Sequence, residues 1–233
     1  DGTQVKRNSR VSTYHQPMVQ LTWYWDPNPK TSFNTTFYYF GGKAGQTTLE
    51  WGEAKDPRPD YYRNLPSYFL GNAHSQAEYE AQLNAWLNHD PSVCQINWDE
   101  LYMANRNHLA TVHNANGGES DVTGKFSKYI LAERHYDKLQ AGNATYFKHE
   151  INPNFHLTGG FAISASRTHY YENVNDLLGG DYYYDINKYA ENMESDECQV
   201  DLNNPNHVAR VGDIINYNYY ANRDYGRIWN QWN

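Results

Sequence analysis

PMVQLTWYWDPNPKTSFNTTFYYFG, residues 17–41, is the stretch that decides the fold class, because two alternating runs flank a short turn. Large apolar residues occupy every second position from Val19 to Trp25, and the period of two returns from Phe33 to Tyr39. The intervening DPNPK contains two prolines, which lack the N–H that a ladder needs. The stretch therefore predicts a β-hairpin with strands over about residues 11–26 and 31–41.

Aromatic side chains crowd the turn end of this predicted hairpin, at Trp23, Tyr24, Trp25 and Phe33. Two environments suit such a hairpin: a soluble β-sandwich and the wall of an outer-membrane β-barrel. In a barrel, aromatic girdles lie at the headgroup level and strand segments of about 9–11 residues cross the lipid. The hairpin taken alone favours the sandwich, and the later segments decide between the two.

Aromatic residues supply much of the apolar surface of this 233-residue chain, which has 22 Tyr, 8 Phe and 7 Trp. The mean hydropathy is only -0.92, a combination typical of barrels with wet loops and of aromatic-lined carbohydrate-binding proteins. A net charge of -8 argues against a nucleic-acid partner, which requires a basic surface. No apolar run approaches the ~20 residues of a membrane helix, so a helical membrane protein is excluded.

Two cysteines, Cys94 and Cys198, lie in polar surroundings. They permit one disulfide in an oxidising compartment, and two thiols fit the sequence equally well. No signal peptide is present at Asp1, so we expect a chain that is either processed or cut from something longer.

Residues 42–124 form a long excursion, which opens with the aperiodic GGKAGQ and contains no good lipid-facing strand. Within it, Ser75 and Glu78 have the spacing of a capping box and predict the start of a helix. Asn97 predicts the start of a second, short helix that ends at about Asn105.

Regular alternation returns in the second half of the chain, over about residues 125–151, 155–170 and 213–233. Another tight turn, NPN, separates the first two of these strands, and a second excursion covers about residues 171–212. Short turns at one end and long loops at the other are typical of outer-membrane barrels. We therefore predict an all-β fold: antiparallel strands of an outer-membrane β-barrel, with long extracellular loops that carry short helices.

No pattern in the chain predicts catalysis or a metal centre. His108 and His113 do not share a helical face, and no HExxH or CxxC spacing occurs. The acidic loop residues lack EF-hand spacing, and no nucleophile is paired with a base. We expect no enzyme, no cofactor and no metal ion, and interpret the acidic residues as a solvated surface. These acidic residues are Glu119, Asp121, Glu194, Asp196 and Glu197.

Clusters of rings in the two excursions are the candidate ligand-binding residues. Large rings bury much surface at little entropic cost, and their polar tips suit a wet barrel mouth, where they could stack on a sugar or clamp a peptide. Packing of the two loops on each other is the alternative interpretation. The candidates are Trp51, Tyr61, Tyr62, Tyr68 and Phe69 in the first excursion and Tyr182, Tyr183 and Tyr184 in the second.

Four ordered passages carry a family likeness: DPRPDYYRNLPSY at 56–68, INWDELYMANRN at 96–107, NVNDLLGGDYYYD at 173–185 and DLNNPNHVARVGD at 201–213. Together they resemble the barrels of Bacteroidetes-type TonB-dependent outer-membrane receptors, and the likeness extends over nearly the whole chain. The resemblance implies nutrient uptake across the outer membrane, with a plug, the TonB system and a surface lipoprotein as expected partners.

The resemblance covers only part of such a receptor. Nothing in the chain is similar to a plug, a TonB box or the closing strand, and five strands cannot close a barrel of about 22 strands. We therefore expect an internal segment of the barrel, which does not transport by itself.

A secreted, aromatic-rich β-sandwich that binds carbohydrate is the alternative hypothesis. A third, a secreted eukaryotic protein, would use the sequons at Asn34 and Asn143, but both lie within predicted strands. The first two hypotheses differ in where seven apolar side chains point: outward to lipid in the receptor, or into one dry core in the sandwich. These side chains belong to Val19, Leu21, Phe33, Phe37, Leu157, Phe161 and Ile163.

Overall fold

The computed structural model describes residues 7–52, 54–71, 74–187, 189–190 and 198–232. The chain divides into two compact units. The first, here the sheet unit, comprises Asp1–Thr48, Glu133–Asn173 and Ile214–Asn233. The second, here the loop unit, comprises Leu49–Ala132 and Val174–Asp213.

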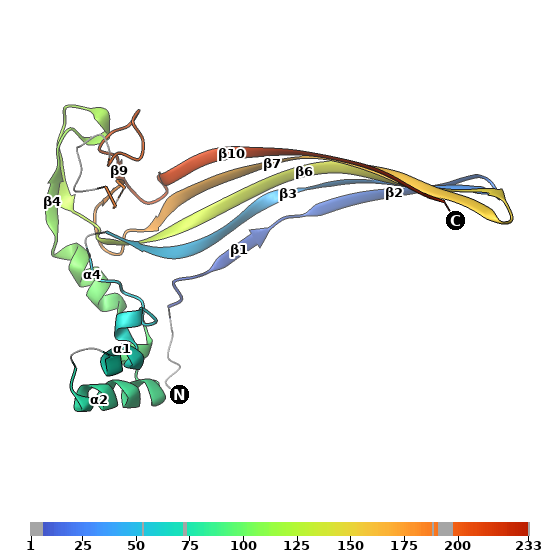
Figure 1. Ribbon diagram of the computed structural model, residues 1–233. Helices are drawn as coiled ribbons and strands as arrows, with labels where there is room; N and C mark the ends of the chain where they lie inside the picture. Colours follow the sequence, from blue (N-terminus) through green and yellow to red (C-terminus); the bar gives the residue numbers. More distant parts are fainter. Residues whose placement is uncertain (1–6, 53, 72–73, 188, 191–197, 233) are drawn as a thin grey trace, which may run out of the picture. The chain divides into compact units, whose positions relative to one another are not determined.

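One large sheet has the strand order β1-β3-β6-β7-β10, with β2 also paired to β3 (Figure 1). The pairs β1–β3, β2–β3 and β7–β10 are antiparallel, which confirms a mostly antiparallel β fold. Among the described residues the two ends of this order do not pair with each other, so the sheet is open. Its strands are β1 (Ser12–His15), β2 (Met18–Asn28), β3 (Thr31–Trp51), β6 (Tyr129–Asn152), β7 (Phe155–Asp176) and β10 (Ile214–Trp232).

The hairpin expected from the first stretch is present, with Leu21 opposite Phe37. Its first strand differs from the expected span of residues 11–26, because β1 and β2 are separate strands that pair with successive parts of β3. Pro17, between them, cannot donate to the ladder. On β3 the change of partner falls at Gly42, where a Cβ would lie 2.0 Å from the His15 carbonyl oxygen.

The second strand of the hairpin continues to Trp51, past the expected end at residue 41. The glycine-containing GGKAGQ therefore does not start a loop, contrary to the prediction. Pairing with β1 and β6 holds the backbone extended there. Gly45 fits this part of the sheet because a Cβ would lie 2.6 Å from the Glu133 side chain on β6, and glycine allows such close approach.

Two other strand boundaries differ clearly from the expected ones. β6 begins at Tyr129 rather than residue 125, because the preceding Val122–Lys125 forms β5 and pairs with β4 (Leu109–Val112) in the loop unit. β7 continues beyond residue 170 to Asp176. β10 lies within the expected 213–233.

Both predicted helix starts are confirmed. Ser75 caps α2 through a capping box, in which its Oγ accepts from the Glu78 amide at 3.3 Å and its own amide donates to the Glu78 carboxylate at 2.7 Å. Asn97 caps α4, its side chain accepting from the Glu100 amide at 3.3 Å. The helical elements are η1 (Tyr62–Asn64), α1 (Pro66–Gly71), α2 (Gln76–Leu87), α3 (Pro91–Cys94), α4 (Trp98–Arg106) and η2 (Ala115–Gly117).

None of the helices in the described part of the chain has the length and hydropathy to cross a lipid bilayer.

The loop unit has its own hydrophobic core in two clusters. One joins Leu49 and Leu131 with Leu101 of α4 and Leu178. The other gathers around Tyr182 and includes Val208 of the short strand β9 (Val208–Ala209), which pairs with β8 (Tyr183–Tyr184). This unit therefore folds around packed side chains contributed by both of its chain segments.

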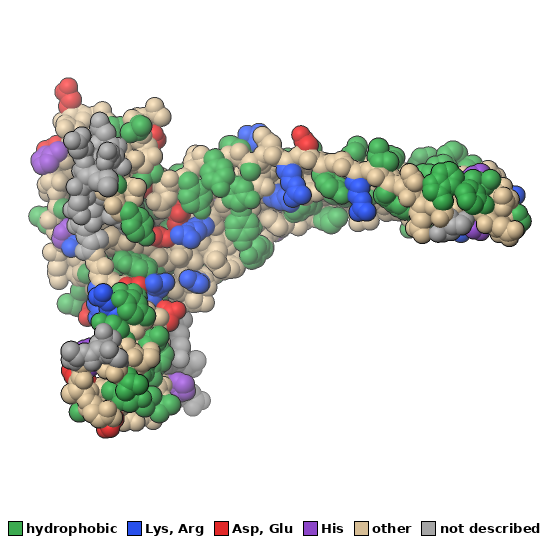
Figure 2. All heavy atoms as spheres, in the orientation of Figure 1, with side chains coloured by type: hydrophobic (Ala, Val, Ile, Leu, Met, Phe, Trp, Pro, Cys, Tyr) green, Lys and Arg blue, Asp and Glu red, His purple; other side chains and the backbone are tan. Residues whose placement is uncertain are grey.

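The sheet unit is different, because its large apolar side chains do not meet in a core. Of the seven that distinguish a sandwich from a membrane wall, five are exposed and two are half-buried. The exposed fraction reaches 69% at Val19 and 55% at Ile163. Figure 2 shows apolar side chains exposed along the length of this sheet. Within the described residues of this unit, no second sheet packs on the first, as a sandwich would require.

Both sequons lie in strands, Asn34 in β3 and Asn143 in β6. Asn143 is 9% exposed, and its amide donates to the Thr36 carbonyl at 3.1 Å. A glycan would have no room at that nitrogen.

Candidate functional site

The sheet unit has one mainly apolar face that crosses from β2 to β10 and is interrupted by the polar side chains of Thr35, Asn143 and Thr145. Leu21 is opposite Phe37, and the ring of Phe33 lies 6.2 Å from that of Phe147 on β6. Gly159 of β7 abuts Phe147, which places the odd-numbered residues of β7 on this face. The larger members are Val19, Leu21, Trp23, Trp25, Phe33, Phe37, Tyr39, Leu139, Phe147, Ile151, Leu157, Phe161, Ile163, Ile228 and Trp232.

The opposite face of the same strands is polar. The Thr22 and Thr36 hydroxyls lie 3.1 Å apart, the Gln140 amide donates to the Tyr38 hydroxyl at 3.3 Å, and the ring of Trp229 lies 5.8 Å from that of Tyr146. Between residues 160 and 168, β7 contributes only small side chains to this face. Its members include Gln20, Thr22, Thr36, Tyr38, Gln140, Tyr146, Ala162, Ser164, Ser166, Thr168, Tyr225 and Trp229. The two faces of this single layer therefore differ in polarity.

Rings border the apolar face at both ends of the strands. At the turn end, Trp25 stacks on Phe33 at 5.3 Å between ring centres. At the other end, rings and a cation form a row across three strands, in which His135 stacks on Tyr171 at 4.4 Å and the Arg167 guanidinium covers the Tyr220 ring at 4.0 Å. The centre of the His169 ring lies 4.5 Å from that of Tyr171 and 4.2 Å from that of Tyr220. On β7 the apolar segment between these borders spans residues 157–165, close to the about 9–11 residues that cross a bilayer.

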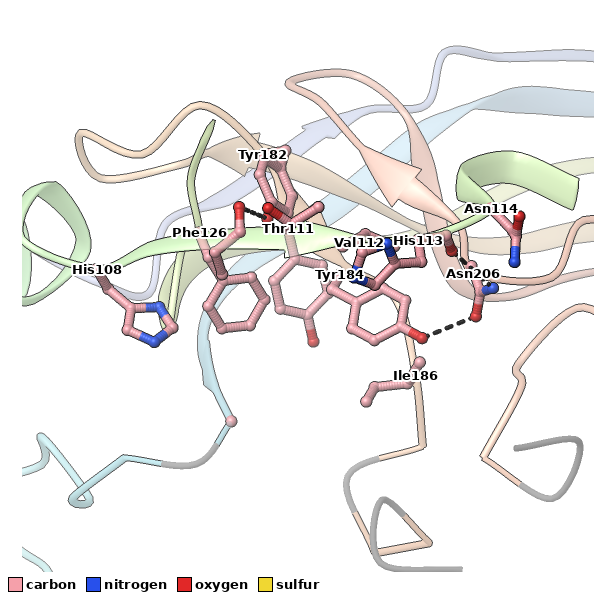
Figure 3. A pocket seen from close by; sticks show the side chains of 13 residues that line it. His108, Thr111, Val112, His113, Asn114, Phe126, Tyr182, Tyr184, Ile186 and Asn206 are labelled. Carbon is pink, nitrogen blue, oxygen red and sulfur yellow. Dashed lines mark hydrogen bonds between the residues drawn. The ribbon is translucent and has the colours of Figure 1, made fainter. Parts of the chain in front are cut away.

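The loop unit contains a pocket of about 450 Å³. Its wall comes from β4, the residue before β4, and the segment around β8. Figure 3 shows the side chains of His108, Phe126 and Tyr184 pointing to the same side. The lining residues are Gly52, His108, Ala110, Thr111, Val112, His113, Asn114, Phe126, Tyr182, Tyr183, Tyr184, Ile186 and Asn206.

Hydrogen bonds hold two of the pocket tyrosines in place. The Tyr182 hydroxyl donates to the Ala110 carbonyl at 3.0 Å, and the Tyr184 hydroxyl donates to the Asn206 side-chain oxygen at 2.9 Å. Burial raises the pKa of both phenols, so both remain neutral donors at physiological pH. The His108 Nδ1 is buried and has no hydrogen-bond partner among the described residues.

The ring residues predicted from the sequence fall into two groups. Those of the first excursion contact one another edge to face, with centres 4.8 Å apart for Tyr61–Tyr62 and 5.6 Å for Tyr62–Tyr68. Phe69 lies 6.3 Å from Tyr68. Trp51 packs on the first core cluster, beneath the Arg58 guanidinium at 5.2 Å. These residues lie outside the pocket lining.

The rings of the second excursion line the pocket, although Tyr182 and Tyr183 are only 1% and 2% exposed. Tyr182 also belongs to the second core cluster, so it packs as the alternative interpretation expects. Sequence reasoning missed His108 and Phe126 as pocket residues. Their contribution depends on the pairing of β4 with β5 and on the bridge between Phe126 and Tyr182, which no local pattern indicates.

Cys94 and Cys198 are not joined in a disulfide. Cys94 ends α3, whereas Cys198 is buried beside Gln199. Among the described residues, no group of three or more His, Cys, Asp or Glu side chains could hold a metal ion. Of the acidic candidates, Asp121 pairs with His113 at 2.8 Å. Glu194, Asp196 and Glu197 lie outside the described residues.

A buried ion pair makes the loop unit sensitive to pH. The His207 Nδ1 lies 3.4 Å from the carboxylate of Asp185, which is 3% exposed. The hydrogen bond with Asp185 raises the pKa of His207 above its ordinary value of 6.5, and burial opposes this less strongly. Since the folded pKa exceeds the unfolded one, this stabilisation is complete below about pH 6.5 and is lost as pH rises through the folded pKa.

We therefore expect the stability of the loop unit to fall as the pH rises from about 6.5 through the folded pKa of His207, because the His207 proton is lost. Hydrogen exchange of backbone amides around β9, measured across this range, checks the prediction. In His207→Gln the decline should be smaller than in the unaltered chain. An unchanged pH profile in that variant would show that another group is responsible.

No family model matches this chain, and neither a curated protein nor a solved structure matches it.

Proposed function

We propose that this chain forms part of the wall and the extracellular loops of a TonB-dependent outer-membrane receptor that imports a nutrient. The observation that carries the proposal is the single-layer sheet with one apolar and one polar face. The four passages that resemble this receptor family, at residues 56–68, 96–107, 173–185 and 201–213, support it independently.

Exposure of the apolar face is the physical argument. Burial of one large aliphatic or aromatic side chain is worth about 1.5–3 kcal/mol, and water-soluble monomers rarely expose apolar patches above a few hundred Å². Leu21, Phe37 and Ile163 are each more than half exposed on this face. Lipid would cover such a face, and rings at both borders suit the two headgroup regions.

The polar face requires water on the other side of the wall. Its hydroxyl and amide groups hydrogen-bond across the strands, as between Thr22 and Thr36, and lipid could not solvate them. Apolar-out and polar-in alternation is the pattern of an outer-membrane barrel around an aqueous interior.

The open edges support further strands as the first proposed partner. β10 forms one edge of the sheet, and β1 with β2 forms the other. Unpaired backbone groups at such edges are not tolerated in lipid. The rest of the receptor, including a plug that couples to the TonB system, would supply the missing strands and drive transport.

The loop unit fits the role of an outer surface that holds the nutrient. It has its own core and a ring-lined pocket with a buried imidazole nitrogen, and the rings around Tyr62 offer a second aromatic surface. A surface lipoprotein is a further partner of this unit. The proposed localisation is the outer membrane, and the proposed role requires no catalysis.

The test is the behaviour of the chain in buffer and in detergent. We expect aggregation in buffer that is relieved by nonionic detergent, because the apolar face needs an apolar medium. Sedimentation velocity with and without detergent, together with thermal melting, measures this. A soluble monomer with a sharp cooperative melt in buffer would contradict the proposal and favour the secreted carbohydrate-binding alternative.

A further inference from the structure

Charge is distributed very unevenly between the two units. The sheet unit contains 11 Lys and Arg against 7 Asp and Glu, a formal charge of +4 in a chain whose net charge is -8. The loop unit contains 8 against 20 and carries the remaining -12. The sheet unit therefore has a positive net charge, although the net charge of the whole chain is negative.

Four of the basic side chains on β6 and β10 lie on the polar face. Lys138 is on it, with its ammonium 5.2 Å from the Phe40 ring, and Lys148 follows at an even-numbered position of the same strand. On β10, Arg223 is opposite Ser166 and Arg227 is opposite Ala162, both on the polar face. Two cations, Lys43 and Arg167, lie on the apolar face instead. Glu133 and Asp137 occupy strand positions near Lys43, and Asp224 occupies one near Arg167.

Carboxylates on the polar face do not neutralise these cations. Glu172 is 1% exposed, and its oxygens already contact the Arg134 guanidinium at 3.3 Å and the Asn216 amide at 3.1 Å. Glu150 lies near the turn end of β6. Among the described residues, neither Arg223 nor Arg227 has an ion-pair partner.

The strand between the two rows of cations carries short side chains beside them. β7 lies between β6 and β10 and contributes Ala162, Ser164, Ser166 and Thr168 to the polar face. Small side chains there allow a solute to approach the sheet between longer basic ones, and their hydroxyls can donate hydrogen bonds. Arginine in particular forms bidentate, charge-assisted hydrogen bonds with carboxylate, phosphate and sulfate groups.

We infer that the polar face of the sheet unit binds anionic solutes and selects a nutrient that carries carboxylate, phosphate or sulfate groups. The inference rests on the proposed function, in which this face lines the aqueous path. Rings of basic side chains give pores their preference for anions.

The experiment compares two matched pairs of substitutions in the chain reconstituted in nonionic detergent. Arg223→Gln with Arg227→Gln removes two cations from the polar face, and Lys43→Gln with Arg167→Gln removes two from the apolar face. The probe is a methoxypyrene trisulfonate, followed by fluorescence anisotropy and competed with inorganic pyrophosphate at constant ionic strength. We expect the first pair to weaken probe binding about five- to twentyfold and the second less than about twofold, because only the first pair contacts the anion.

Equal losses in the two pairs, or no loss in the first, would overturn the inference. Flotation of each variant with phospholipid vesicles reports separately on the proposed function. If the chain inserts into the vesicles but substitution of Arg223 and Arg227 leaves probe binding unchanged, only the proposed anion site is wrong. If the chain does not insert but these arginines still control probe binding, the anion site stands and the receptor assignment fails.

Discussion

Replacing Asn105 with Ala should lower the free energy of unfolding of the loop unit by about 3–5 kcal/mol, because it leaves several buried backbone groups without partners. Asn105 is fully buried at 0% exposure. Its amide nitrogen lies 2.8, 2.9 and 3.1 Å from the carbonyls of Tyr129, Leu177 and Leu178, and its side-chain oxygen accepts from the Tyr129 amide at 3.1 Å. One side chain thus ties α4 to both segments of the unit.

Hydrogen exchange with mass spectrometry measures this effect without requiring the whole chain to unfold reversibly. We expect Asn105→Ala to lose protection in α4 and around Tyr129. Asn107→Ala is the matched control, since that exposed residue ends the same helix and the change should cost less than about 0.5 kcal/mol. Equal protection in the two variants would mean that the Asn105 hydrogen bonds contribute little.

Replacing Ile163 with Arg should weaken insertion into phospholipid vesicles by about 2–4 kcal/mol, the cost of an arginine at the lipid midplane of a barrel. Ile163 is 55% exposed, opposite Gly226 on the apolar face, and lies midway along the apolar segment of β7. In lipid the new guanidinium would meet only hydrocarbon. In water the same exposed position would accept arginine at little cost.

Ser164→Arg is the matched control, because the next residue along β7 points to the polar face, opposite Tyr225. We expect this variant to insert within about 1 kcal/mol of the unaltered chain, since its side chain stays in water. Vesicle flotation at graded urea concentrations measures both equilibria. Equal effects of the two substitutions would show that lipid does not contact the apolar face.

Short-range patterns predicted the elements that depend on few neighbours. The alternation on either side of DPNPK predicted the pairing of β2 with β3, because one residue step on a strand always reverses the face. Ser75 and Asn97 predicted the helix starts, because a cap bonds to an amide only three residues away. The mostly antiparallel β class followed from these signals and from the later runs.

Long-range contacts decided what the patterns missed. The glycines of GGKAGQ looked like a loop, but β3 continues through them because β1 and β6 pair with it. The rings of DYYYD were candidate ligand-binding residues, and all three line the pocket, yet Tyr182 and Tyr183 are buried. Burial depends on which distant segments cover a residue, and residue type alone does not contain that information.

By itself, the sequence determined that this protein is built from two-faced antiparallel strands with helices capped in the intervening excursions, because period, turn and cap chemistry act over a few residues. Only the tertiary structure decided that the apolar face has no second layer, that Arg223 and Arg227 lie on the opposite face, and that His108, Phe126 and Tyr184 share a pocket. These features arise from strand order and from contacts between residues tens of positions apart. Packing and solvation, rather than local propensity, determine which of these contacts form.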